Sequence, residues 1–340
     1  MVAGMPVLYS LYVYAPSKIA PVIFTAAFAI SAAFDLWQCF RCKAFKLIGL
    51  HPLCAALFAA GFALREYGAQ NHYIYSETNK STLLTFILSQ VFIYICPPLL
   101  ELANYHVLGR LLHYVPYCSP LPPSKVLVVF GGLMAVVEAL NSLGVSLSAN
   151  SSASASKQSL GSNLTVSALT LQLLVILCFA CLAGLFQRRC IKAGVHVKIV
   201  RNMLVTLYVS MTLILLRCIY RLVEHTGSTK INIADLASMK ALSPLLRYEY
   251  FFYIFEAGLM LANSLLWNLW HPGRFLPRDV HIFLAQDGTE VAGAEESDRR
   301  PLIAKVANVI SFGLLGVLAG KKKQPQRSQE LNEYPAGIRS

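Results

Sequence analysis

The stretch Met203–Val223, MLVTLYVSMTLILLRCIYRLV, decides the fold class of this chain. It is 21 residues long, and a helix of about 20 apolar residues crosses the hydrocarbon core of a bilayer. Arg217 and Arg221 nevertheless stand inside it, and Glu224 follows directly. A charge at the centre of a membrane helix costs about 2.5–3.5 kcal/mol on insertion scales, so it seldom occurs there without a partner or a function. The stretch predicts a transmembrane helix that carries a polar site.

The composition of the whole chain agrees with this interpretation. Of its 340 residues 56% are hydrophobic and only 14% are charged, with a mean hydropathy of +0.55. Soluble proteins carry about 25% charged residues. The apolar residues also form long uninterrupted runs. We therefore expect an all-α integral membrane protein.

Seven apolar runs are long enough to be transmembrane helices. They divide the chain into an N-terminal segment (1–18), a seven-helix transmembrane domain (19–271) and a C-terminal tail (272–340). The seven runs are Ile19–Cys39, Phe45–Leu64, Thr82–Leu102, Val126–Leu147, Ser167–Phe186, Met203–Val223 and Tyr250–Leu269.

The distribution of basic residues predicts the orientation. Cytoplasmic loops are enriched in Lys and Arg. The loops after the first, third and fifth runs are the richer set, with Arg41, Lys43, Lys46, Arg110, Lys125, Arg188, Arg189, Lys192, Lys198 and Arg201. This places the N-terminus outside the cell and the C-terminus in the cytoplasm.

Two further features bear on this topology. The glycosylation triplets at Asn79, Asn150 and Asn163 all fall in loops that it places outside, where glycans are attached. The cytoplasmic tail is expected to be largely disordered. Its apolar run 306–318 is flanked by Arg and Lys, so it either lies on the inner leaflet or is a chance apolar stretch in a disordered tail.

Charged residues in the last two runs are spaced as helix faces. Arg217, Arg221 and Glu224 lie at i, i+4 and i+7, and Glu249 and Glu256 are seven residues apart. The two helices are antiparallel, so Arg217 and Glu256 each lie seven residues from the outer boundary, roughly 10 Å deep. We expect these charges to pair. The pairs either only hold the helices together or also form a polar site for a charged head group.

Two other acidic residues fall in apolar runs. Glu138 lies near the middle of the fourth run, where an acid is by default a candidate site or relay. Glu101 and Asp35 lie toward inner ends and could simply reach the interface. The adjacent Pro97 and Pro98 predict a break or kink near Glu101, with or without a cavity.

Motifs of common enzymes are absent from the sequence. It has no phosphate-binding G-x-x-x-x-G-K-[ST], no H-E-x-x-H, no G-x-S-x-G and no paired Cys/His metal spacing. We expect no enzymatic activity, no cofactor and no metal site.

The late motifs resemble those of the fungal lipid-translocating exporter family, whose members include aminocholesterol-resistance, sphingoid-base and protoporphyrin transport proteins. Its R-x-x-x-R-x-x-E motif resembles Arg217, Arg221 and Glu224, and its E…Y-x-x-D…HPG motif resembles the stretch from Glu249 to Gly273. The earlier motifs resemble Tyr14-Ala-Pro16, Gly61-Phe-Ala-Leu-Arg65 and Tyr105-His-Val-Leu-Gly109-Arg110. The family usually has His at position 35, Asp at 138, Gln at 141 and Asp at 256, where this chain has Asp35, Glu138, Asn141 and Glu256.

The resemblance implies a seven-span protein that moves an amphiphile, such as a sphingoid base or a sterol-like drug, and contributes to efflux or resistance. Its location would be the plasma membrane of a fungus. We expect lipids or amphiphilic small molecules as partners and no nucleic acid. The alternative is a seven-span lipid-sensing receptor that signals through its cytoplasmic loop and tail. The candidate binding residues are Arg217, Arg221, Glu224, Glu249, Glu256, Glu138 and Glu101.

The orientation is testable in intact cells. An acceptor site engineered near Asn150 should receive a glycan or react with an impermeant label, because positive loops stay in the cytoplasm. A tag at the C-terminus should be protected from the same label. Labelling of that tag without permeabilisation would reverse the predicted orientation.

Overall fold

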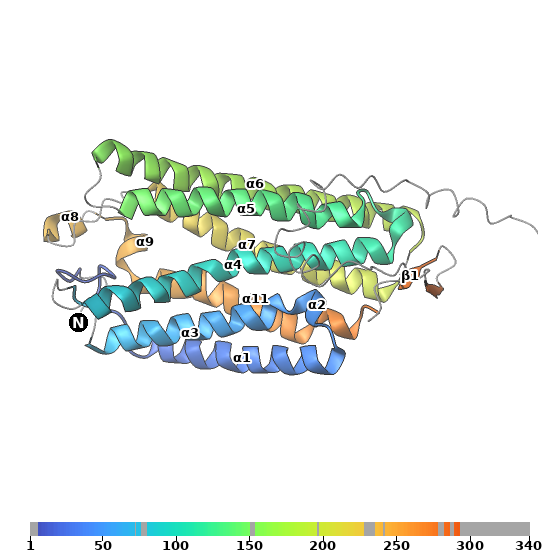
Figure 1. Cartoon of the computed structure of the whole chain (residues 1–340), viewed down its shortest axis with the longest axis horizontal. Helices are drawn as coiled ribbons and strands as arrows, with labels where there is room; N and C mark the ends of the chain where they lie inside the picture. The colour runs from blue at the N-terminus through green and yellow to red at the C-terminus, as the bar shows by residue number, and fades with distance from the viewer. Residues whose placement is uncertain are drawn as a thin grey trace, which may run out of the picture. The chain divides into compact units, whose positions relative to one another are not determined.

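The long helices of the computed structural model run side by side as one bundle (Figure 1). The structure describes residues 6–71, 73–75, 80–149, 154–195, 197–227, 235–240, 242–277, 282–285 and 289–292. Within them the long helices are α1 (Ala20–Cys42), α3 (Leu50–Asn71), α4 (Lys80–Tyr114), α5 (Pro123–Ala149), α6 (Ala155–Lys192) and α7 (Lys198–Thr226).

The last long helical segment is built from three consecutive pieces. α10 (Glu249–Phe252) leads into a π-helical turn, η2 (Tyr253–Gly258), which continues as α11 (Leu259–Leu269). Short elements complete the described chain: α2 (Phe45–Ile48), η1 (Pro116–Cys118), α8 (Leu236–Lys240), α9 (Pro244–Arg247), η3 (Pro272–Arg274), β1 (Ile282–Leu284) and β2 (Glu290–Ala292). The two strands pair antiparallel, with Phe283 opposite Val291.

Six of these segments are long and apolar enough to cross a membrane: α1, α4, α5, α6, α7 and the segment of α10, η2 and α11. α3 is 22 residues long but less apolar, because any 18-residue stretch within it includes Arg65 and Glu66. The all-α membrane class expected from composition is therefore supported by six helices, and α3 is the remaining long helix of the described bundle.

The distribution of side chains on α1 is the reverse of that in a soluble protein. Its buried face carries the polar residues Ser31, Asp35 and Gln38. Its exposed face carries large apolar side chains: Val22, Ile23, Ile30, Phe34, Leu36, Trp37 and Phe40. Hydrocarbon solvates such an apolar surface, while polar groups must find partners inside the bundle.

The second helix differs from the predicted run Phe45–Leu64. The chain forms the single turn of α2, Gly49 ends it by donating its N–H to Phe45 O (2.9 Å), and α3 starts at Leu50. α3 then continues to Asn71, so Arg65 lies inside the helix and not in the following loop.

The predicted break at Pro97 and Pro98 does not occur, since α4 continues through both prolines. α3 supports α4 at this point by two sulfhydryl hydrogen bonds: Cys54 Sγ donates to Cys96 O (3.7 Å) and Cys96 Sγ to Cys54 O (3.5 Å).

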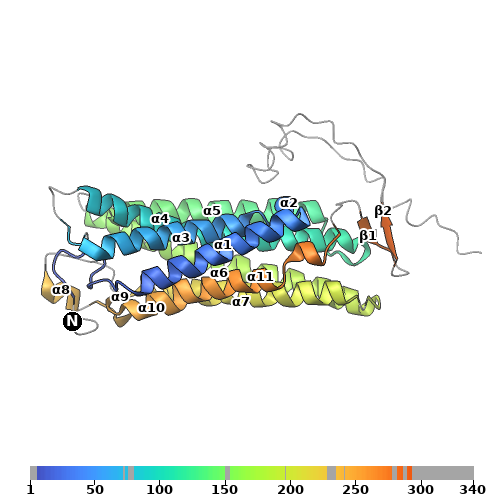
Figure 2. The same ribbon diagram turned by 90° about the horizontal axis from the view of Figure 1, so that it is seen from below.

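The N-terminal segment folds over one end of the bundle, where α8 and α9 also lie (Figure 2). Val13 packs with Met239 and Leu242, and Ser10 forms a β-bridge with Ile74. This packing brings Tyr14 to the end of α3. At the opposite end, Tyr114 on α4 donates a hydrogen bond to Glu290 of β2 (2.8 Å).

The glycosylation triplets and the tail run are placed only in part. Asn163 lies on the exposed side of α6 within the helix, so the expected loop is shorter than the sequence indicated. Asn79, Asn150 and the apolar run 306–318 lie outside the described residues.

α5 and α6 form a tight hairpin because glycine lets their backbones approach. A Cβ atom on Gly144 would stand 2.7 Å from Thr165 N and 2.8 Å from Gly161 O. A Cβ atom on Gly161 would stand 2.6 Å from Ser148 N. Small residues at helix interfaces are the usual device for close packing in membranes.

Substitution of these glycines tests the hairpin. Gly144→Ala or Gly161→Ala should lower the free energy of unfolding by roughly 1–3 kcal/mol, the usual cost of overpacking. Gly132→Ala on the same helix is the control, because a Cβ atom there meets nothing within 4 Å. It should be neutral or stabilising by about 0.5–1 kcal/mol. Thermal unfolding of the purified variants in detergent measures both, and equal melting temperatures for all three variants would contradict the packing.

Candidate functional site

A buried ion pair between α7 and η2 forms the centre of the site. Arg217 Nε donates to Glu256 Oε1 at 2.7 Å, and the two side chains are 5% and 0% exposed. The matched depths in the sequence predicted this contact. Glu256 Oε2 is buried and has no hydrogen-bond partner among the described residues. The pair therefore holds two helices together and retains one acceptor oxygen.

The π-helical turn that carries Glu256 changes where the acids point. The seven-residue spacing of Glu249 and Glu256 predicts one helix face, but Glu249 contacts Arg65 on α3 while Glu256 contacts Arg217 on α7. One additional residue in a turn rotates the following helix by about 100°. The prediction of a shared face was therefore wrong. Single π-helical turns within α-helices frequently occur at functional sites.

Glu101 is fully buried on α4 and does not reach the interface, contrary to the expectation that it could. Tyr105 donates a hydrogen bond to Glu101 Oε1, and Gln172 Nε2 on α6 donates to Oε2 at 3.0 Å. α4 continues beyond the predicted run to Tyr114, so Glu101 lies well inside the helix.

Arg217 also acts at longer range on two acids besides Glu256. It interacts electrostatically with Glu101 on α4 and with Glu138 on α5. Glu138 is half-buried, so it is the most accessible of the three acids. The positive charge that acts on Glu138 comes from α7 at longer range, and no salt bridge among the described residues joins Glu138 to Arg217. Arg217 thus interacts with carboxyl groups from three other elements, in direct contact only with that of Glu256.

The remaining arginine of the motif pairs within its own helix. Arg221 donates to Glu224 Oε2 at 2.5 Å, and its guanidinium lies 4.3 Å from the centre of the Tyr94 ring. Both side chains are mostly buried, at 15% and 12% exposure. This pair lies one helical turn from Arg217, toward the end that bears the N-terminal segment.

Arg65 was not among the predicted site residues, yet it is buried and donates three hydrogen bonds. It is 1% exposed and donates to Glu249 Oε1 (3.2 Å), Tyr14 OH (3.0 Å) and Tyr253 OH (3.2 Å). Its guanidinium also lies 4.5 Å from the ring of Tyr12. Glu249 in turn accepts the backbone N–H of Ser17 at 2.8 Å. Both charged groups therefore bond to protein groups, and these bonds connect α3, α10 and the N-terminal segment.

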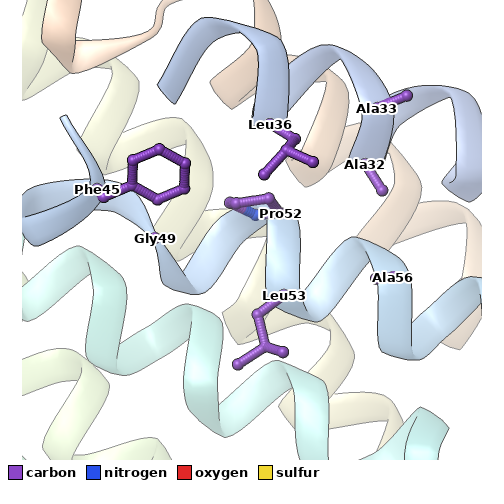
Figure 3. A pocket seen from close by; sticks show the side chains of 8 residues that line it. All are labelled: Ala32, Ala33, Leu36, Phe45, Gly49, Pro52, Leu53 and Ala56. Atoms are coloured by element: carbon purple, nitrogen blue, oxygen red, sulfur yellow. The ribbon is translucent and has the colours of Figure 1, made fainter. Parts of the chain in front are cut away.

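An apolar groove lies apart from these charges, between α1 and the α2–α3 region (Figure 3). Small and aliphatic side chains line it: Ala32, Ala33, Leu36, Phe45, Gly49, Pro52, Leu53 and Ala56. None of the candidate binding residues belongs to the groove. Its chemistry suits a hydrocarbon chain and not a charged head group.

Comparison with known proteins places these motifs in a family. Residues 53–279 match the family described as RTA1 like protein, a range that includes all the charges above. This chain belongs to the RTA1 like family. It is 55% identical over 339 residues to a lipid-translocating exporter-like protein RTA1 of Leptosphaeria maculans, an alignment that covers 98% of this chain and 65% of that protein.

A second relative is more distant. A lipid-translocating exporter-like protein RTA1 of Ajellomyces capsulatus is 27% identical over 253 residues, which is 70% of this chain and 75% of that protein. The chain thus spans less than two thirds of the length of the first relative. No solved structure matches it significantly. The fungal lipid-translocating exporter resemblance seen in the sequence is confirmed by these matches.

The RTA1-type charge motifs therefore separate into two roles by their bonding. Arg65 and Glu249 are bonded to each other and to groups of the N-terminal segment, whereas the centre around Arg217 has more acids than bases and a carboxylate oxygen without a partner among the described residues. The centre around Arg217 is the better candidate for binding a ligand, and the pair at Glu249 is better explained by stability.

An exchange of charges tests whether Arg217 and Glu256 depend on each other. Arg217→Glu or Glu256→Arg alone should lower stability by about 3–5 kcal/mol, the usual effect of leaving a buried charge unpaired. The double exchange should recover part of this loss. Glu224→Ala is the milder control, because its site is nearer the end of α7. Size-exclusion profiles and melting temperatures in detergent report folding, and a double variant no better than the sum of the singles would refute the dependence.

Proposed function

We propose that this protein moves an amphiphilic lipid between the leaflets of a membrane, with the head group held at the centre around Arg217. The single observation that carries the proposal is a desolvated charge cluster inside an apolar bundle. Arg217 pairs with Glu256 and interacts at longer range with Glu101 and Glu138, and Glu256 Oε2 has no partner in the described part of the chain. Ionisable groups inside a membrane protein commonly mark a substrate path. The names of the two relatives support the same function.

The charge count favours a basic head group. This part of the bundle holds four carboxyl groups, those of Glu101, Glu138, Glu224 and Glu256, and two guanidinium groups, those of Arg217 and Arg221. An ammonium group placed among them would gain a charge-assisted hydrogen bond to an acid without displacing the arginine. A sphingoid base or an amine-bearing sterol-like drug has such a head, while its tail can remain against the apolar outer surface.

The structure suggests which element the head group would pass. Glu138 on α5 is half-buried, whereas Glu101 and Glu256 are fully buried. A head group would therefore meet Glu138 first and the deeper acids afterwards. No enzymatic step is needed for this movement, and we propose none.

We propose that α3 is the seventh crossing, with the N-terminus outside and the C-terminus in the cytoplasm. α3 runs alongside α1 and α4 for most of their length (Figure 1). Its charge Arg65 is shielded by aromatic rings and by Glu249, which lowers the cost of placing it near a membrane boundary. The plasma membrane of a fungus and a role in efflux or resistance are part of this proposal. The receptor alternative depends on a tail that lies mostly outside the described residues, and no observation in the described part favours it.

Leaflet exchange of a fluorescent amine lipid in liposomes tests the proposal. The purified protein should accelerate the exchange, and Glu101→Gln and Glu138→Gln should each reduce the rate about tenfold or more, a loss of roughly 1.4 kcal/mol. Ser142→Ala is the matched control, since Ser142 is exposed on α5 one turn beyond Glu138.

A second lipid separates head-group recognition from a general disturbance of the bilayer. An uncharged lipid with the same chain should respond much less to either Glu→Gln change. Equal exchange by wild-type protein, both variants and empty liposomes would contradict the proposed function.

A further inference from the structure

A ladder of polar side chains joins α1 to α11, apart from the centre around Arg217. Ser31 and Ser264 share a hydrogen bond of 2.7 Å, and Asn268 Nδ2 donates to Ser31 Oγ at 2.5 Å. Two turns further along α1, Gln38 Nε2 donates to Asn268 O at 2.9 Å. The first part of this interface is thus well bonded.

Four oxygen atoms in the same ladder have no hydrogen-bond partner among the described residues. They are both carboxyl oxygens of Asp35, Oε1 of Gln38 and Oδ1 of Asn268. The three side chains are 0–4% exposed. In Gln38 and Asn268 the amide nitrogen is bonded and only the oxygen is free. All four of these unpartnered atoms are therefore acceptors, and none of them receives a hydrogen bond from a described residue.

The groups that face Asp35 supply no positive charge. Cys39 on α1 and Cys54 on α3 interact electrostatically with Asp35, and neither carries a positive charge. Cys39 Sγ in turn lies 3.8 Å from His271 Nε2, after the end of α11. His51 on α3 is buried against Trp267, with neither ring nitrogen bonded to a described residue.

Arginine and lysine side chains of the described residues do not pair with the Asp35 carboxyl group either. Arg274 interacts with His271, and no described arginine or lysine forms a salt bridge with Asp35. A buried carboxylate without a counter-charge is strongly unfavourable, and buried polar groups are normally partnered.

The ligand that satisfies this arrangement is a small cation. Carboxylate and amide oxygens are the donors that hard cations prefer. Asp35 is the one carboxylate in the ladder, so it balances a single positive charge. Among the described residues, no group of three His, Cys, Asp or Glu side chains is placed to hold a metal ion, which disfavours a multiply charged metal here.

We propose that Asp35, Gln38 and Asn268 form a binding site for one monovalent cation, sodium or a proton. Both bring one positive charge to the Asp35 carboxyl group, and the amide oxygens complete the shell directly or through water. This second site goes beyond the proposed lipid movement and does not depend on it, because no described contact joins Asp35 to Arg217.

The tryptophans provide a direct readout of the site. The chain contains three: Trp37, Trp267 and Trp270. Trp37 lies on α1 two residues from Asp35, and Trp267 is buried beside His51 with its Nε1 bonded to Ser210 Oγ at 3.1 Å. Intrinsic fluorescence of the purified full-length protein in detergent can therefore follow binding without any lipid assay.

The experiment has two titrations. Sodium chloride replaces choline chloride at fixed pH and fixed ionic strength, and in a second series pH varies in choline chloride alone. Saturable fluorescence change with sodium indicates the metal ion, and a change with pH alone indicates the proton. Asp35→Asn, which keeps the shape of the side chain and removes its charge, should abolish whichever change the wild type shows.

The control and a second variant keep the proposal refutable. Asp235→Asn makes the same chemical change at an exposed residue and should titrate like the wild type. Gln38→Met keeps the length of the side chain and removes its oxygen. The sodium or proton concentration that gives half of the fluorescence change should therefore rise about tenfold. This variant tests the proposal if Asp35→Asn does not fold. A wild type that responds to neither cation, or an Asp35→Asn variant that responds like the wild type, would overturn the proposal.

Discussion

The ion pair between Arg217 and Glu256 is the constraint on which the interior of this bundle depends. Each residue alone would be an uncompensated charge in a low-dielectric setting, where such a charge is expensive. Their bond at 2.7 Å requires α7 and η2 to stay in register. The position of α7 in turn fixes how Arg217 approaches Glu101 on α4 and Glu138 on α5.

The π-helical turn makes two different pairings possible within one helical segment. Glu249 turns toward Arg65 on α3, and Glu256 turns toward Arg217 on α7. The first pair stabilises the end of the bundle that bears the N-terminal segment, together with Tyr12 and Tyr14 of that segment. The second leaves one oxygen without a described partner. The same segment therefore serves both stability and, in our proposal, recognition of a head group.

Much of this architecture follows from the sequence because its signals are strong and local. Long apolar runs predicted the helices, and equal distance from the boundary predicted that Arg217 and Glu256 meet. The resemblance of the late motifs also indicated the family that the comparisons show. Hydropathy does not fix helix ends, however. α3 begins later than the apolar run indicated, because α2 ends at Gly49. Both α3 and α4 also extend beyond their predicted ends, so Arg65 and Glu101 lie within helices of the bundle.

Other features depend on contacts between segments far apart in the chain. A π-helical turn has no simple periodicity signal, so the different directions of Glu249 and Glu256 were not predictable from spacing. The sequence allowed Asp35 to reach the membrane interface, yet it lies at 0% exposure, buried where α1 faces α11. Only the packed structure shows that its oxygens and those of Gln38 and Asn268 lack donors in the described residues.

Photocrosslinking maps the position of a bound head group most directly. An amine lipid that carries a photoreactive group next to its nitrogen would be bound to the protein in liposomes, activated by light, and the modified peptides identified by mass spectrometry. We expect adducts on α4, α5, α7 and η2 near Glu101, Glu138, Arg217 and Glu256, reduced by an excess of unlabelled lipid. Adducts confined to lipid-facing side chains, unchanged by competition, would show that the interior charges do not bind the head group.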